Sequence, residues 1–273
     1  MKPNAAKAVS VAPANIKHMS VRPKKHLGQH FLRDRNIARK IAGALDCSLC
    51  RHVLEIGPGT GILTEFLLEK CPEKLQTVEI DREAAAYLKR RFGDKIFIYE
   101  TDFLKMDLSR LYPEGGLCII GNFPYNISSQ IFFKILENHT LIPQVVGMIQ
   151  KEVAERISAI HGNKRYGILS VLLQIFYQVE KLFDVPPGVF SPPPKVQSSV
   201  VRLTHRRDFP RMNEELFRHL VKTAFNQRRK TLRNSLKKLN LPPQNTWKEF
   251  EGLRPEQLSP ADFVQLYRII YNQ

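Results

Sequence analysis

Val53-Leu-Glu-Ile-Gly57-Pro-Gly59-Thr-Gly61 decides the fold of this 273-residue chain. The apolar residues predict a buried strand, and the glycines predict a tight turn that opens a helix. A turn of this kind lets a ligand approach the backbone closely, so we expect a nucleotide-like cofactor there. The glycines alone leave a second interpretation open, in which the turn needs them only for its geometry.

Strand-like and helix-like segments alternate outward from this turn. A helix is expected first at 34–45, with Asp34 as its N-cap. The expected strands then cover 52–56, 75–80, 96–99, 117–121, 144–149 and 198–203, and the expected helices cover 60–69, 83–92, 128–137 and 153–160. Alternation at this spacing predicts an α/β fold, a Rossmann-like parallel sheet with helices on both faces.

A proline-rich segment and then a purely helical pattern follow this alternation. The prolines between 186 and 194 exclude a helix or a central strand and predict a rigid surface loop. From Asn213 onward we expect only helices, at 214–225, 228–239 and 260–270, with a turn-like segment at 242–245. The predicted divisions are a basic, disordered tail at 1–22, an α/β domain at 23–204 and a small all-helical domain at 205–273.

Positive charge is concentrated in two stretches. The net charge is +16, and 1–33 holds seven basic and no acidic residues while 216–239 holds eight basic and no acidic residues. A merely solubilising surface is the alternative, but charge this localised favours a surface that follows RNA phosphates. The helix expected at 228–239 carries its basic residues without acidic partners. We expect RNA contacts from Arg228, Arg229, Lys230 and Arg233.

Neither a metal site nor a membrane segment is expected. Cys47-x-x-Cys50 has no second pair of the kind that a zinc site needs, so we expect these two cysteines to be ordinary thiols. We expect the four cysteines of the chain to form no disulfide framework. The longest apolar run, 168–179, is too short to span a bilayer and predicts a buried strand. We expect a cytoplasmic monomer.

An acidic residue at the end of a second strand supports the cofactor site. Glu79 follows the glycine turn by about 20 residues, where its carboxylate can accept both hydrogen bonds of a ribose diol. The G-x-G-x-G spacing disfavours a nicotinamide cofactor and favours S-adenosylmethionine. Asp102, after the third strand, lies where it can accept from the cofactor's adenine amine; a solvated turn aspartate is the alternative.

The most specific motif is Ile119-Ile-Gly-Asn122-Phe-Pro124-Tyr125, at the carboxyl end of another buried strand. Adenine's exocyclic nitrogen is a poor nucleophile because its lone pair is delocalised into the ring. Methylation therefore needs acceptors for the two amine hydrogens, and the side-chain oxygen of Asn122 and a backbone carbonyl at Phe123 or Pro124 suit this role. Tyr125 would stack on the base. The motif predicts amine methylation on a nucleobase; an ordinary Asn-x-Pro turn is the alternative.

Phe190 is the candidate for a second aromatic wall. It lies in the proline-rich segment, where it would cover the other face of an extruded base. A core phenylalanine that anchors the loop is the alternative.

Together these residues resemble a known family. Similar motifs occur in the KsgA/RsmA-type small-subunit rRNA adenine dimethyltransferases: Lys25-His-Leu-Gly28-Gln29-His30-Phe31-Leu32, Glu55-Ile-Gly57-Pro-Gly59-Thr-Gly61, Val78-Glu79-Ile-Asp81, Asp102, Asn122-Phe-Pro-Tyr125 and Val189-Phe190-Ser-Pro-Pro-Pro-Lys195-Val. The resemblance implies a class I methyltransferase sheet with a basic helical C-terminal domain. The family often has Asn at the position of His30 and usually Leu at that of Phe123.

The resemblance implies S-adenosylmethionine-dependent dimethylation of the N6 amine of two adjacent adenosines. The target would be a hairpin near the 3′ end of 16S rRNA, within an assembling small ribosomal subunit. By motif position the resemblance assigns cofactor contacts to His30, Leu32, Gly57, Glu79, Asp102 and Asn122. It assigns the adenine pocket to Asn122, Pro124, Tyr125 and Phe190.

Three alternatives are weighed against this hypothesis. The macrolide-resistance methyltransferases that act on 23S rRNA share the methylation motifs, but the basic C-terminal helices and the proline-rich loop favour the small subunit. An rRNA-binding assembly factor in which catalysis is secondary is disfavoured by the intact Glu79, Asp102 and Asn122. A DNA adenine methyltransferase usually carries Asp rather than Asn before the aromatic motif.

Overall fold

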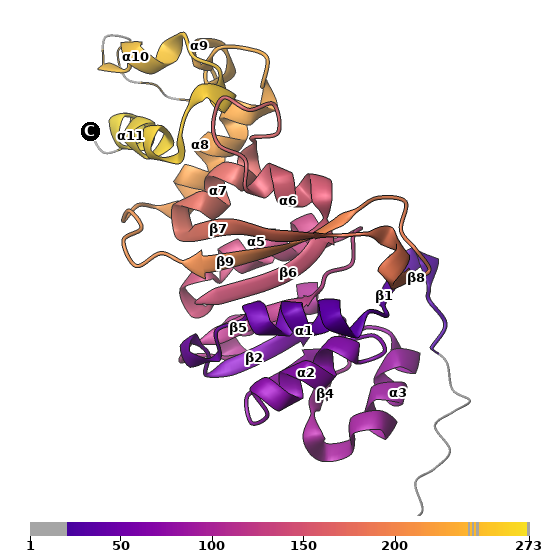
Figure 1. Ribbon diagram of the computed structural model, residues 1–273. Coiled ribbons are helices and arrows are strands. Elements are labelled where there is room, and N and C mark those ends of the chain that lie inside the picture. Colours follow the sequence, from indigo (N-terminus) through magenta and orange to yellow (C-terminus); the bar gives the residue numbers. More distant parts are fainter. Residues whose placement is uncertain (1–20, 240, 242, 244–245, 272–273) are drawn as a thin grey trace, which may run out of the picture.

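A seven-stranded sheet forms the centre of the computed structural model, with helices on both of its faces (Figure 1). The structure describes residues 21–239, 241, 243 and 246–271. Most of the tail predicted at 1–22, and part of the turn predicted at 242–245, therefore lie outside the described residues. The strands are β2 (His52–Ile56), β3 (Leu75–Val78), β4 (Phe97–Tyr99), β5 (Leu117–Asn122), β6 (Gln144–Gln150), β7 (Tyr177–Val185) and β9 (Ser198–His205).

The order of the strands creates a site for a ligand. The sheet runs β4-β3-β2-β5-β6-β9-β7, and the neighbours from β4 to β6 are parallel, while β9 is antiparallel to both β6 and β7. The chain builds outward from β2 on one side and from β5 on the other. The carboxyl ends of β2 and β5 therefore flank the switch point, where open α/β sheets bind their ligands.

Alternating residues of the strands point to opposite faces of the sheet and pack in two hydrophobic cores. Val53 packs in the core beneath α1 (Arg35–Ala44), α2 (Ile62–Lys70) and α3 (Arg82–Phe92), whereas its neighbour Leu54 packs in the core that contains the apolar residues of the other helices. Those helices are α5 (Ser128–Glu137), α6 (Lys151–Ile157) and α7 (Ile168–Phe176). A strand buried on both faces is largely apolar, as Val53, Leu54 and Ile56 of β2 predicted, although β2 also contains the buried Glu55. The N-cap prediction at Asp34 is also confirmed, since its carboxylate accepts from the backbone of Asn36 and Ile37.

The C-terminal helices continue the core of the α/β part. They are α8 (Glu214–Asn226), α9 (Leu232–Ser235), α10 (Lys248–Glu251) and α11 (Pro260–Tyr271). Phe217 of α8 and Phe263 of α11 are fully buried in the same cluster as Leu172 of α7. His139 adds a polar link, because its ring lies 2.8 Å from a carboxylate oxygen of Glu214. The division predicted near 204 thus crosses a shared core.

Two secondary-structure predictions are wrong. The apolar run at 168–179 forms helix α7 and only then enters β7, because a short apolar run has no periodicity that separates a buried helix from a buried strand. Among the described residues, no helix combines the length and apolarity needed to cross a membrane. The helix expected at 228–239 is reduced to α9, because 228–230 form a turn and Thr231 is extended.

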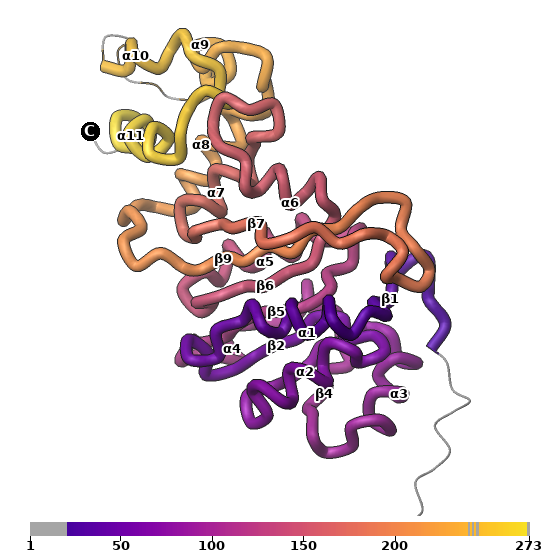
Figure 2. The backbone as a smooth tube through the Cα atoms, in the orientation of Figure 1, coloured from indigo at the N-terminus to yellow at the C-terminus, as the bar shows by residue number. Residues whose placement is uncertain are grey.

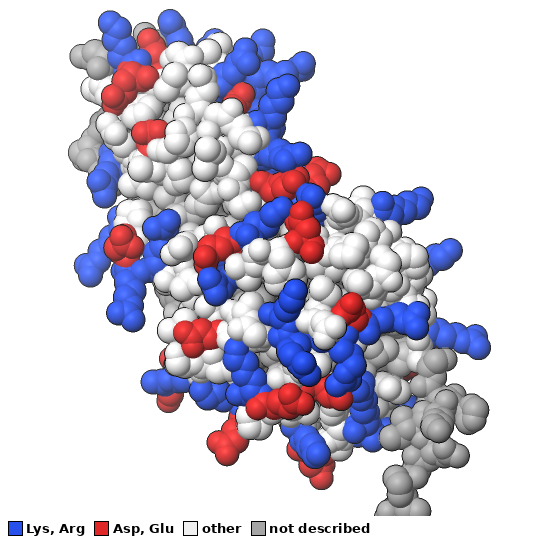
Figure 3. Space-filling view, in the orientation of Figure 1, with Lys and Arg blue, Asp and Glu red and all other residues white. Residues whose placement is uncertain are grey.

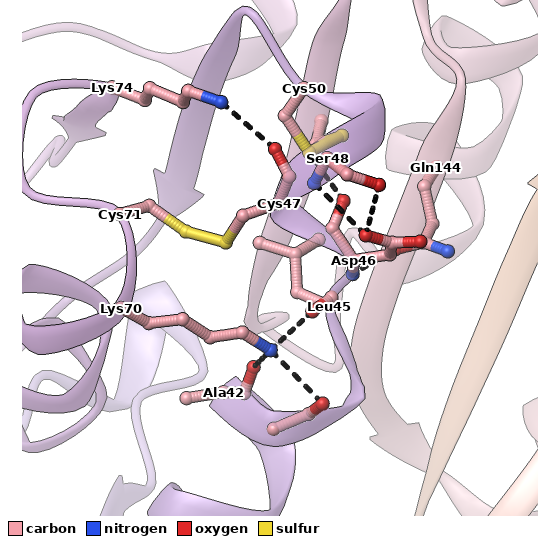
Figure 4. The surroundings of a disulfide bond; sticks show 12 residues. Ala42, Leu45, Asp46, Cys47, Ser48, Cys50, Lys70, Cys71, Lys74 and Gln144 are labelled. Carbon is pink, nitrogen blue, oxygen red and sulfur yellow. Dashed lines mark hydrogen bonds between the residues drawn. A yellow bond between two sulfur atoms is a disulfide. The ribbon is translucent and has the colours of Figure 1, made fainter.

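The prediction of free cysteines is also wrong. Cys47 is paired with Cys71 (Figure 4). Cys50 is paired with Cys118. The short helix η3 (Cys47–Leu49) carries Cys47 toward the end of α2 and is followed by Cys50, which faces β5. Their Cα atoms lie 6.4 Å and 5.5 Å apart, distances that a disulfide spans. Both pairings depend on tertiary packing, so the local spacing gave no sign of them.

The proline-rich segment pairs with the start of the described chain. β8 (Phe190–Ser191) runs antiparallel to β1 (Phe31–Leu32), and the tube in Figure 2 shows these distant segments side by side. The Arg33 N–H extends the pairing by donating to the Val189 carbonyl at 2.8 Å. This pairing holds the residues before β1 over the carboxyl edge of the sheet.

We expect Gly121→Ala to destabilise the protein by about 1–3 kcal/mol, the usual cost of overpacking. A Cβ at Gly121 would lie 2.5 Å from the Ile56 carbonyl oxygen, so β2 and β5 would have to separate. Gly43→Ala in α1 is the control, because its Cβ would meet nothing within 4 Å and should stabilise the helix by about 0.5–1 kcal/mol. Urea denaturation measures the free energy of unfolding of both variants. A Gly121→Ala variant as stable as wild type would contradict the close packing of β2 and β5 at this switch point.

Candidate active site

A pocket lies at the carboxyl edge of the sheet, between β2 and β5. Its walls are the loops that follow β2, β3, β4 and β5, and segment 27–31 closes one side. Seven of the predicted site residues line it together: His30, Gly57, Glu79, Asp102, Asn122, Pro124 and Tyr125. The fold thus gathers residues that are almost 100 positions apart in sequence.

The glycine turn shapes the floor of the pocket. Gly57 has φ +64°, and a Cβ built there would meet no protein atom within 4 Å. The side chain would project into the pocket, so the glycine leaves space that a ligand can occupy. Gly59 serves packing instead, because its Cβ would lie 2.8 Å from the Phe31 ring.

Glu79 is buried at the end of β3 and is held by backbone groups. One carboxylate oxygen accepts from the Gly59 N–H at 3.2 Å, and the other accepts from the Asp81 N–H at 2.9 Å. Burial raises the pKa of Glu79 above its ordinary value, although these two donors oppose the shift. Each oxygen has a second lone pair for a ligand hydroxyl.

Asn122 presents an unused acceptor to the pocket. Its amide nitrogen donates to the His30 carbonyl at 2.8 Å. A carbonyl can only accept, so this contact fixes the nitrogen on that side and the oxygen on the other. The Oδ1 atom is buried without a hydrogen-bond partner. Because an orphaned buried acceptor is costly, this atom needs a donor from a ligand.

Neighbouring groups hold the rest of the Asn122 motif. The Phe123 ring is fully buried and lies over Gly147, and the Phe123 N–H donates to Met148 at 3.0 Å. The Tyr125 hydroxyl shares a short hydrogen bond with Ser198 of β9, and its ring centroid lies 5.4 Å from that of His30. Burial raises the pKa of Tyr125 above its ordinary value, although the hydrogen bond with Ser198 opposes the shift.

Other predicted site residues lie elsewhere. Leu32 is 4% exposed and lines a smaller hollow behind the glycine turn. Phe190 is 3% exposed and packs in the core beneath α1, outside the lining of the pocket. Its present position is the one expected for a phenylalanine that anchors the loop.

The predicted RNA residues lie on the C-terminal part. Arg229, Lys230 and Arg233 are exposed, and Arg228 to Lys230 line a separate hollow beyond α8. The prediction that this cluster lacks acidic partners is wrong for Arg228, whose Nε lies 3.9 Å from a Glu256 oxygen. Arg228 also donates to the Lys164 carbonyl, so it joins two loops rather than facing solvent freely.

Two acidic residues of the site were not assigned a role from sequence. Glu55 is fully buried on β2, where it accepts from the Thr64 hydroxyl at 2.7 Å. Asp81, just after Glu79, binds the segment that closes the pocket. Both belong to the motifs that carry the family resemblance, and a charged residue inside an apolar strand is the signal that makes Glu55 noticeable.

The sheet order and the position of the pocket define the class I S-adenosylmethionine-dependent methyltransferases. A crystal structure of a dimethyladenosine transferase from Plasmodium falciparum is similar, with TM-score 0.74 and 29% identity over 87% of this chain and 96% of that one. The 23S rRNA methyltransferase ErmE shares the fold at TM-score 0.71 and 24% identity, over 89% of this chain and 100% of that one.

Sequence comparison narrows the class to a family. The family described as "Ribosomal RNA adenine dimethylase" matches residues 21–271, and the chain belongs to it. The relative named "Ribosomal RNA small subunit methyltransferase A" from Parabacteroides distasonis is 55% identical, over 90% of this chain and 93% of its own. The relative of the same name from Flavobacterium johnsoniae is 52% identical, over 90% of this chain and 95% of its own.

We expect Glu55→Gln to remove a pH-dependent loss of stability. Burial raises the pKa of Glu55 from 4.5 to about 8. Between these values the folded protein keeps a proton that the unfolded chain releases, so stability falls as pH rises. In the ligand-free protein, the variant's advantage over wild type should grow by at least about 1.4 kcal/mol between pH 5 and 8.5, the value of one pKa unit. Thermal unfolding across this range is the measurement, and a constant difference would contradict the buried, protonated carboxyl.

Proposed function

We propose that this S-adenosylmethionine-dependent methyltransferase dimethylates the N6 amine of two adjacent adenosines in a hairpin near the 3′ end of 16S rRNA. The single observation that carries the chemistry is the buried, unpartnered Oδ1 of Asn122 in the pocket. An acceptor fixed in this position matches one hydrogen of an exocyclic amine and suits no apolar substrate.

The residues of the pocket fit the cofactor. Gly57 leaves open space at the turn, Glu79 offers two oxygens at a strand end for a ribose diol, and Asp102 lines the pocket where an adenine amine would lie. We also assign cofactor contacts to His30, Asn122 and Leu32, the last from the hollow behind the turn. When bound, the cofactor supplies an electrophilic methyl group on a sulfonium.

The protein's own groups would prepare the amine. Asn122 Oδ1 would accept one N6 hydrogen, and a backbone carbonyl would accept the other, which favours a pyramidal nitrogen with an available lone pair. We assign this role to the carbonyl of Phe123 or to that of Pro124, which accepts from Ile127 at 3.2 Å and keeps a second lone pair. Tyr125, held by Ser198, would stack on the base. The methylated amine becomes acidic and can release its proton to water, so no general base is assigned.

Phe190 would complete the base pocket only after a rearrangement. Its side chain is buried beneath the β1–β8 pair, and an extruded adenine would need it to turn toward Tyr125. We propose this movement as part of substrate binding, since a flipped base is usually held between two walls.

The relatives favour the small-subunit target over the large one. Proteins that share 52–55% identity with this chain across 90% of its length are named for the small subunit. At 24% identity, the likeness to the 23S enzyme concerns the fold alone. We further propose that the protein acts as a monomer in the cytoplasm, on rRNA within an assembling small subunit.

Mass spectrometry of rRNA tests the target. Purified protein and labelled S-adenosylmethionine are incubated with undermethylated small subunits and, separately, with 23S rRNA. We expect dimethyladenosine at two adjacent positions of 16S rRNA. Label in 23S rRNA would contradict the target, and no label in either RNA, with intact RNA binding, would favour an assembly factor.

Asn122→Ala tests the chemistry. Methyl transfer should fall by about 10²–10³-fold, as when one oriented transition-state partner is removed, while RNA binding stays close to wild type. Single-turnover kinetics measure the rate of methyl transfer, and filter binding measures the affinity for RNA. Near-normal transfer would contradict amine activation by Asn122. Gly43→Ala on α1 is the matched control and should transfer methyl groups at the wild-type rate.

The exposed basic residues of the C-terminal part should set the salt dependence of RNA binding. Lysine and arginine side chains lie along the edges of this part of the molecule and also over the rest of the face shown in Figure 3. We expect Arg229→Gln/Lys230→Gln to weaken binding and to lower the slope of log affinity against log salt by up to about 0.7–0.9 for each phosphate that the protein no longer neutralises. Arg90→Gln/Lys95→Gln, at α3 and the turn after it, removes the same charge at the opposite end of the molecule in Figure 1 and should change the slope little. Equal slopes for the two variants would indicate that RNA binds to another surface of the protein.

A further inference from the structure

Residues 24–33 form a strap across the cofactor pocket. Leu27 to Phe31 line the pocket from one side. Gly28 of the strap, at φ +64°, lies so close to Asn126 that a Cβ would be 2.7 Å from its side-chain oxygen. Nothing inside the strap is a long regular element, since it holds only the turn η2 (Lys25–Leu27) and the two-residue β1. Its position therefore depends on contacts with the rest of the protein.

The two ends of the strap are fastened differently. At its C-terminal end, β1 pairs with β8, the His30 carbonyl accepts from Asn122, and His30 Nδ1 lies 2.8 Å from the Pro192 carbonyl oxygen. Lys24 at its N-terminal end and Gln29, next to His30, both bind one residue, Asp81, through their side chains. The Asp81 side chain is fully buried, whereas that of Lys24 is 35% exposed.

Asp81 binds the strap through both of its carboxylate oxygens. Oδ1 accepts a short hydrogen bond from the Lys24 ammonium, and Oδ2 accepts from the Gln29 amide at 3.1 Å. Gln29 in turn accepts from the Lys24 backbone N–H at 2.8 Å, so the three residues form a closed ring of hydrogen bonds. The Asp81 backbone N–H donates to Glu79, the proposed ribose ligand. One residue therefore contacts both the strap and the group that would hold the cofactor.

The charge of Asp81 is maintained by these partners. Burial on its own would raise the pKa of Asp81, but the Lys24 ammonium, the Gln29 amide and the Glu83 N–H together hold that pKa below its ordinary value. Removing a partner from a buried charge is costly, whereas water readily replaces an exposed partner. The closed position of the strap is thus favoured by the need to compensate this carboxylate.

We propose that Asp81 is a positioning residue that latches the strap over the cofactor, so that the cofactor enters and leaves when Lys24 and Gln29 release Asp81. The proposal rests on the assignment of this pocket to S-adenosylmethionine. It adds a gate to the site: the strap is hinged where β1 meets β8 and opens at the Asp81 end.

Asp81→Asn tests the latch with little other change. Asparagine has the same shape and is an equally good N-cap for α3, where Asp81 accepts from Glu83. We expect S-adenosylhomocysteine to dissociate at least about tenfold faster in stopped-flow experiments, in line with the loss of a hydrogen bond to a charged group. Hydrogen exchange should accelerate in 24–32 but not in α3. Lys24→Met should reproduce both effects, and the double variant should be no faster than either single one.

Glu83→Gln is the matched control. Its carboxylate lies 3.8 Å from the same Lys24 ammonium but is 49% exposed, so its loss should leave dissociation and exchange close to wild type. If hydrogen exchange of the strap were unchanged in Asp81→Asn, the latch would be overturned. A fall in ligand affinity without faster exchange would then come from the contact of Asp81 with Glu79 and not from release of the strap. If the wild-type protein bound no S-adenosylhomocysteine, the assignment of the pocket to S-adenosylmethionine would be wrong. Hydrogen exchange of the ligand-free variants would still show whether Asp81 holds the strap in place.

Discussion

The hydrogen bond from the Asn122 amide to the His30 carbonyl links the strap, the sheet and the pocket. It uses the nitrogen of the amide and leaves the oxygen of this pocket-lining residue without a partner, so the orientation of the proposed acceptor is set by a contact with the backbone. The bond also requires β5 to end close to the glycine turn, which Gly121 permits by lying against the Ile56 carbonyl. The chemistry proposed for Asn122 therefore depends on how closely β2 and β5 approach.

The residues at the strand ends were predictable from sequence, and the reason is topological. Parallel strands place their carboxyl ends at one edge, so Gly57, Glu79, Asp102 and Asn122 had to meet once the alternation was recognised. The alternation also predicted parallel strands, but it predicted neither β7 nor the antiparallel insertion of β9 between β6 and β7. No local pattern distinguishes a strand that returns between two others.

Features that depend on packing were not predictable in the same way. Phe190 is buried because β8 pairs with β1, a pairing between segments more than 150 residues apart. The cysteines are paired because η3 meets both α2 and β5. Arg228 looked like part of a free basic helix until the loop at 162–164 supplied its carbonyl partners. In each case the sequence contains the residue but not the neighbour that fixes its role.

The core shared by α7, α8 and α11 limits how proteins of this architecture can change their RNA targets. A module with its own separate core can be exchanged as a unit, but Phe217 and Phe263 fill the same apolar interior as Leu172, so a chimera cut near 204 would expose a broad apolar face on both halves. Divergence in target choice would then proceed through the outer side chains of these helices, one substitution at a time, with the scaffold beneath them left in place.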